Sequence, residues 1–253
     1  MPKSYLKKTG KSPLSFAANA NRQKFTSEEA AVMAQPHKPE AFLICCIDSR
    51  FQPAKALDYG PGVALECRCI ACVIPPEKEA DADVLSRMAF RRINNIRNIV
   101  LVSHSDCGGA QTALRVPQPD LSKGDDLHAI AAIVHRAHPD LSRIGQQFLK
   151  SENGDLRKAG DLFAREVSVR SLQNLMGYKG CGEFATVGDE VKADALQVTL
   201  LHYDLEKRRF DIYDPGKGKW RNMADAANLL KLVPAPAPDQ ACCLHHKASQ
   251  LKK

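Results

Sequence analysis

Two short apolar runs, each followed directly by side chains that bind metals, constrain this chain more than any other feature. The runs at residues 42–44 and 99–102 are rich in β-forming residues, and runs of this length are typical of buried parallel strands. Cys46 follows the first run, and His104 and Cys107 follow the second. Open α/β folds place their sites at the carboxyl ends of such strands, so we expect these three side chains at one edge of a sheet.

The three side chains are of the types that bind zinc. Two thiolates and one imidazole suit Zn²⁺, and three protein ligands leave a fourth position for solvent, which is the composition of a catalytic zinc site. His104 and Cys107 are three residues apart, a spacing that a strand end and its following turn bring together. The sequence therefore predicts a zinc site formed by Cys46, His104 and Cys107.

Composition excludes several other classes of protein. The 253 residues are 44% hydrophobic and 26% charged, as in an ordinary soluble domain. No apolar run approaches the ~18 residues that span a bilayer, so we expect no membrane partner. The net charge is +7, but the basic residues show no aromatic interleaving, so we expect no nucleic-acid partner.

The N-terminus and the cysteine content indicate the cellular compartment of the protein. The N-terminus has no apolar segment typical of a secretory signal, and nine cysteines favour a reducing compartment. We therefore expect a cytoplasmic protein. The first acidic residue is Glu28, and an organelle transit peptide in the basic stretch before it stays an alternative.

The order of expected elements is that of an α/β fold. Helical patterns alternate with the early strands, and two strands come late, around a polar turn. The expected strands cover residues 41–47, 63–68, 99–103, 196–201 and 209–213. The expected helices cover residues 27–33, 83–96, 125–137 and 155–176, and one more begins at Gly108.

Three segments follow from this order. Residues 1–37 are expected to form a basic arm with a short helix, capped by Ser27. Residues 38–233 are expected to form the zinc-binding α/β domain. Residues 234–253 begin with alternating Pro and Ala, which is typical of a linker, and end in a tail with two cysteines and two histidines.

From these residues the chain resembles the β-class carbonic anhydrases. The resemblance covers roughly residues 38 to 213, and the first and last zinc motifs are highly specific together. The matching runs are Cys46-Ile47-Asp48-Ser49-Arg50, Pro61-Gly62, Arg68-Cys69-Ile70-Ala71, His104-Ser105-Asp106-Cys107-Gly108-Gly109, and the helix pattern Val167-Ser168-Val169-Arg170-Ser171-Leu172-Gln173-Asn174-Leu175.

The resemblance implies a fold, a reaction and an assembly. It implies four parallel strands plus an antiparallel edge strand, flanked by helices, and zinc held by the three residues named above. It implies a homodimer or a multiple of dimers, with the N-terminal arm embracing the partner. The implied reaction is the reversible hydration of carbon dioxide to bicarbonate and a proton, by hydroxide generated on zinc near neutral pH.

Further residues take expected roles in that reaction. Asp48 would accept a hydrogen bond from the hydroxide, and Arg50, on the same strand face if the strand continues, would hold Asp48 ionised. Amide donors at Gly108 and Gly109, where a helix begins, would orient the developing bicarbonate.

The chain departs from the family in one motif. Cys69 and Cys72 stand where the family has Asn, and with Cys67 they create a cysteine cluster for which core packing is the favoured interpretation. Two alternative functions stay open: hydrolysis of carbon disulfide or carbonyl sulfide at the same zinc site, or zinc or bicarbonate binding without catalysis.

Overall fold

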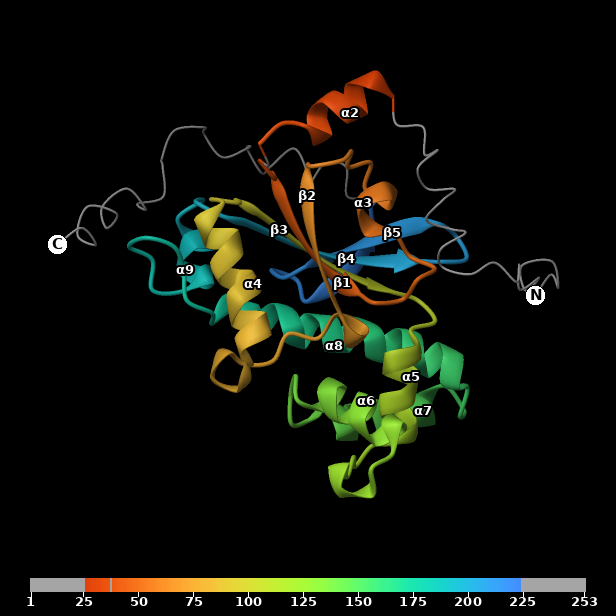
Figure 1. Cartoon of the computed structure of the whole chain (residues 1–253). Coiled ribbons are helices and arrows are strands. Elements are labelled where there is room, and N and C mark those ends of the chain that lie inside the picture. Colours follow the sequence, from red (N-terminus) through yellow and green to blue (C-terminus); the bar gives the residue numbers. More distant parts are fainter. Residues whose placement is uncertain (1–25, 37, 224–253) are drawn as a thin grey trace. The chain divides into compact units, whose positions relative to one another are not determined.

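The computed structural model describes residues 26–36 and 38–223 (Figure 1). The chain divides into two compact units, Met1–His37 and Lys38–Lys253. In the first unit the described part is helix α2, Ser27–Met33. Its cap is Thr26, one residue before the expected Ser27, because Thr26 and Glu29 form a reciprocal capping box. The rest of the expected arm and the Pro/Ala-rich tail lie outside the described residues.

The second unit is built around one mixed sheet in the order β2-β1-β3-β4-β5-β6. The first four strands in this order are parallel, and the last two are antiparallel to their neighbours. The expected sheet is thus confirmed, with one short strand added at its edge. The strands are β1 (Ala41–Cys46), β2 (Ala64–Cys69), β3 (Asn98–His104), β4 (Gln197–Asp204), β5 (Arg209–Asp214) and β6 (Lys219–Asn222).

Helices connect and cover these strands (Figure 1). Apolar side chains of α4, α8 and α9 pack in one core cluster with β1, β3 and β4, whereas α5, α6 and α7 pack with α8 in a second cluster, which contains Cys46 and Cys107. The helices are α3 (Pro53–Ala56), α4 (Ala82–Ile93), α5 (Gly108–Arg115), α6 (Asp126–His135), α7 (Leu141–Ser151), α8 (Leu156–Met176) and α9 (Val187–Lys192).

Two differences from the pattern expected of the sequence have physical causes. Helix α7 was not expected, because its segment follows the polar turn around Pro139 and carries Gly145. In α4, the apolar side chains of Phe90 and Ile93 are 47% and 61% exposed, and the buried residues are Met88 and Arg91. Arg91 is buried because it pairs with the equally buried Glu190 of α9.

The register of the central strands positions the site. Cys45 of β1 pairs with Val102 of β3, so the two parallel strands end close together. Cys45 and Cys46 face opposite sides of the sheet, and their side chains belong to different core clusters. The end of β1 therefore presents Cys46 towards the turn that follows β3.

Candidate metal centre

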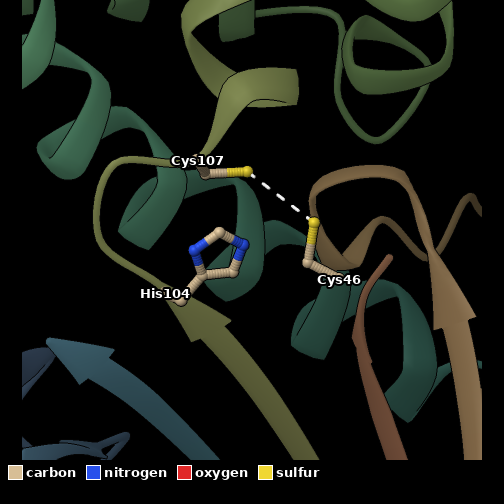
Figure 2. Close-up of side chains that lie close together, drawn as sticks. All are labelled: Cys46, His104 and Cys107. Atoms are coloured by element: carbon tan, nitrogen blue, oxygen red, sulfur yellow. Dashed lines mark hydrogen bonds between the residues drawn. The ribbon is translucent and has the colours of Figure 1, made fainter. Parts of the chain in front are cut away.

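Cys46, His104 and Cys107 form a buried cluster of three metal-binding side chains (Figure 2). One ligand atom from each residue lies within 4.8 Å of the other two, and the two sulfurs are 3.9 Å apart. Two sulfurs on one tetrahedral zinc ion, at the usual bond length, are about 3.8 Å apart. The sulfur spacing in the cluster fits zinc.

His104 is oriented as a ligand by its own backbone neighbourhood. Its Nδ1 lies 2.8 Å from the carbonyl oxygen of Ser105, and its Nε2 is buried without a hydrogen-bond partner. A proton on Nδ1, donated to that carbonyl, leaves the Nε2 lone pair available to a cation. An unpartnered buried nitrogen is unfavourable, and metal binding removes that cost.

The two cysteines share a proton in the absence of a cation. The hydrogen bond from the Cys107 thiol holds the pKa of Cys46 well below its usual range, although burial opposes this effect. The same hydrogen bond, together with burial, raises the pKa of Cys107. Cys46 is thus the first thiolate, and a divalent cation would displace the proton that remains on Cys107.

Backbone amides at the start of α5 contact the sulfur of Cys107 directly. The backbone amides of Gly109 and Ala110 hydrogen-bond to the Cys107 sulfur and act to lower its pKa. These donors point at a metal ligand, whereas Gly108 lies exposed with open space around its α-carbon. The substrate-orienting role expected of Gly108 and Gly109 stays a prediction.

Asp48 and Arg50 form a tight ion pair beside the cluster. Arg50 donates to both carboxylate oxygens of Asp48, with its Nη2 2.6 Å from Oδ2 and its Nε 3.0 Å from Oδ1. These hydrogen bonds lower the pKa of Asp48 to about 2 against a smaller effect of burial. The Oδ2 atom of Asp48 is 4.0 Å from the Nε2 atom of His104.

The pair does not arise from a shared strand face. Strand β1 ends at Cys46, and Asp48 and Arg50 lie in the turn that follows, where the Arg50 amide donates to Asp48 Oδ1 at 2.9 Å. The condition for a shared strand face, that the strand continues to Arg50, is therefore not met. A turn brings residues two apart together through this backbone hydrogen bond.

Two other residues hold this turn, and sequence reasoning gave neither a role. Arg68 of β2 donates from Nη1 to the carbonyl oxygens of Cys46 and Phe51, at 3.3 and 3.1 Å. Asp106 accepts from Nη1 of Arg50 at 2.8 Å. Both lie inside the motifs that identify the family, which was the available signal for them.

Of the unusual cysteines at the end of β2, Cys72 is a core residue and Cys69 is partly buried and packs against the same core cluster. The thiol of Cys69 lies 3.6 Å from the carbonyl of Cys45, and that of Cys72 lies 3.3 Å from the carbonyl of Ile44. Burial raises the pKa of both thiols. Within the described residues neither belongs to a metal-binding cluster, as the core-packing interpretation predicts.

A comparison with known protein families identifies the family of this chain. The family model described as carbonic anhydrase matches residues 41–210, which is most of the chain. The chain belongs to the β-carbonic anhydrase family. Members of this class use zinc, and the spacing, burial and unpartnered nitrogen of the cluster fit that ion.

Relatives in Arabidopsis thaliana match this chain. Beta carbonic anhydrase 5, chloroplastic, is 33% identical over 86 residues, which is 33% of this chain and 28% of that protein. Beta carbonic anhydrase 3 is 26% identical over 184 residues, covering 72% of this chain and 67% of that protein. The first match thus spans under a third of its relative, whereas the second extends over most of both chains.

Solved structures share the fold. The β-carbonic anhydrase CcaA is 18% identical with a TM-score of 0.67, covering 83% of this chain and 97% of that chain. A tetrameric β-carbonic anhydrase from Sordaria macrospora is 21% identical with a TM-score of 0.55, covering 79% and 91%. Among the helices that our structure describes, none has the length and apolar character needed to cross a membrane.

Proposed function

We propose that the chain reversibly hydrates carbon dioxide to bicarbonate and a proton, with zinc held by Cys46, His104 and Cys107. The observation that carries this proposal is the Asp48 carboxylate, 4.0 Å from the unpartnered Nε2 atom of His104. When bound, zinc lowers the pKa of a coordinated water from 15.7 to about 7 and so supplies a nucleophile near neutral pH.

The protein side chains orient and stabilise this reaction. Asp48 stays ionised because Arg50 holds its pKa at about 2, so it accepts a hydrogen bond from the nucleophile and orients it. Carbon dioxide is apolar and needs only an aligned, largely dry space. A cleft of about 310 Å³ begins at Ile47 beside the ligand turn; Ile70 and Val73 form an apolar part of its wall, and charged side chains such as Arg87 form another part. We assign the exposed amide of Gly108 to the product bicarbonate.

A hydration assay on protein of measured zinc content tests the proposal. We expect zinc-dependent proton release from carbon dioxide, followed with a pH indicator in a stopped-flow instrument. Cys46→Ala should lose zinc and activity together, because the site then lacks one of its three protein ligands. Asp48→Ala should keep zinc and lose about 100-fold in turnover, the size of effect typical of a positioned acid–base group.

Cys45→Ala is the matched control for Cys46→Ala. Cys45 is equally buried on the same strand but faces the opposite side of the sheet, so this variant should keep both zinc and turnover. Normal zinc content with no hydration above background would contradict the proposed reaction and favour a binding protein. Turnover of carbon disulfide or carbonyl sulfide in its place would assign the zinc site to hydrolysis.

We also propose a homodimer or a multiple of dimers. The tetrameric relative from Sordaria macrospora supports an oligomer, and β2 is an edge strand whose outer side has no partner strand among the described residues. Light scattering after size exclusion should give at least twice the monomer mass of 27.8 kDa. Deleting residues 1–25 tests the expected embrace by the arm.

The cytoplasmic location stays a prediction.

A further inference from the structure

Asp106 lies at the centre of a hydrogen-bond network behind the Asp48–Arg50 pair. Its Oδ2 atom accepts from Nη1 of Arg50 and its carbonyl oxygen accepts from Nη2, each at 2.8 Å. Its Oδ1 atom accepts from Nε2 of Gln111, also at 2.8 Å. Asp106 therefore binds the edge of the Arg50 guanidinium formed by Nη1 and Nη2, whereas Asp48 binds the edge formed by Nε and Nη2.

A residue from another element holds Asp106 in place. Asp161 of α8 accepts a hydrogen bond from the backbone amide of Asp106, with the two atoms 2.5 Å apart. Asp106 has a φ of 54°, in the left-handed region that is unfavourable for residues other than Gly, Asn and Asp. The hydrogen bond to Asp161 holds the backbone of Asp106 in this conformation, and Gln111 and Arg50 hold its carboxylate.

The position of Asp48 gives this network a consequence for the metal site. Two nitrogen or oxygen ligands of one tetrahedral zinc ion lie about 3.4 Å apart. The Asp48 Oδ2 atom is 4.0 Å from His104 Nε2, so a small movement brings the carboxylate to the distance of a fourth ligand. Arg50 alone does not prevent that movement, because its side chain is 48% exposed and can swing together with Asp48.

We propose that Asp106, held by Asp161, is a positioning residue that keeps Asp48 off the metal and the fourth coordination position open. It does so by binding the Nη1 and Nη2 edge of the Arg50 guanidinium, which fixes this group between two carboxylates from different turns. This inference rests on the proposed zinc function of the site. Asp161 acts only through Asp106, since the hydrogen bond between them joins it to the network.

Cobalt(II) substitution gives a readout that does not depend on hydration activity. The visible absorption of cobalt bound to two thiolates and an imidazole reports its fourth ligand, and thiocyanate is the probe for an exchangeable position. Asp106→Gly removes the carboxylate but suits the left-handed backbone. We expect it to raise the Kd for thiocyanate about tenfold, the order of effect of a hydrogen bond to a charged group, because Asp48 then competes for the ion.

The second residue is tested by a double-mutant cycle. Asp161→Ala should also weaken thiocyanate binding, whereas Asp161→Asn should resemble wild type because its amide oxygen still accepts from Asp106. Adding Asp161→Ala to Asp106→Gly should have little further effect. Glu206→Gln is the control, since Glu206 pairs with Arg157, whose Nε atom lies 4.0 Å from Asp106 Oδ1, and does not itself pair with Asp106 or Arg50 among the described residues.

Two outcomes overturn the inference. One is an unchanged thiocyanate Kd and an unchanged cobalt spectrum in Asp106→Gly, with Asp106→Asn as a second variant if the glycine protein does not fold. The other is a full Asp161→Ala effect in the Asp106→Gly background. If the wild-type protein does not hydrate carbon dioxide but the variants still change thiocyanate binding as expected, the proposed reaction is wrong and the positioning role stands.

Discussion

Asp48 combines two properties at the residue scale: it is mostly covered, with 15% of its side chain exposed, and it is strongly acidic. Hydrogen bonds from Arg50 lower its pKa to about 2, below the ~3.9 of an unfolded Asp. A depressed pKa means that the ionised form stabilises the folded state. This contribution is complete above the unfolded pKa and is lost as the pH falls towards about 2.

We therefore predict a pH-dependent cost for Asp48→Asn in metal-free, reduced protein. The free energy of unfolding should fall by about 1 kcal/mol at pH 5 and above, a modest value because solvent screens the half-exposed Arg50. The difference from wild type should shrink between about pH 4 and 2. Urea unfolding across this range measures it, and a difference that grows towards low pH would contradict the assigned pair.

At this scale, the sequence was enough to predict that Cys46, His104 and Cys107 lie together, but not the network beside them. Cys46, His104 and Cys107 follow apolar strands, and the ends of parallel strands meet by geometry alone. Asp161 lies in the second turn of the long helix α8, with no local pattern that marks it. Its contact with Asp106 depends on how α8 packs against the turn after β3, which requires the tertiary structure.

The close contact between α5 and the 3-10 turn η2, Ile70–Cys72, matters at the scale of elements. A Cβ atom at Gly109 would lie 3.0 Å from Cγ2 of Ile70 and 3.3 Å from Cβ of Ala71. Ala71 and Cys72 both have left-handed φ angles, of 51° and 60°, so this turn has little freedom to move. Gly109 thus lets α5 begin directly against the turn, next to the ligand Cys107.

Gly109→Ala should therefore separate α5 from η2. We predict a loss of about 1–2 kcal/mol of stability from overpacking, together with weaker zinc binding, because Cys107 precedes the displaced helix. Gly108→Ala is the matched control, since nothing lies within 4 Å of the added carbon. Thermal unfolding and competition with a zinc chelator measure both effects; equal behaviour of the two variants would show that the contact relaxes freely.

The apolar pattern predicted the strands best where nearly every position is buried, as in β1 and β3. The strands β1 and β3 and the helix α8 begin and end close to their expected bounds. In α4, a buried arginine interrupts the apolar pattern, so the side of the helix that is buried differs from the side that its apolar residues indicate. The ion pair of Arg91 with Glu190 is a long-range contact, and therefore no local pattern reveals it.

At the scale of the whole domain, the metal centre joins parts that are distant in the sequence. Its ligands come from the end of β1, the end of β3 and the residue before α5, and they lie against a core cluster shared with α8. Binding to the folded state alone stabilises it, because the three donors come together only on folding. The zinc affinity therefore adds to the stability of the domain.

Zinc removal should thus lower the melting temperature of the domain. With free zinc about 1,000-fold above its Kd, the linkage contributes about 4 kcal/mol. This corresponds to about 10 °C for a chain of this size. Calorimetry of chelator-treated and zinc-reloaded protein measures the shift, with reductant present to keep Cys46 and Cys107 as thiols. Cys46→Ala should melt at the same temperature with and without zinc, whereas Cys45→Ala should show the full shift; a zinc-dependent shift in Cys46→Ala would place the stabilising ion at other residues.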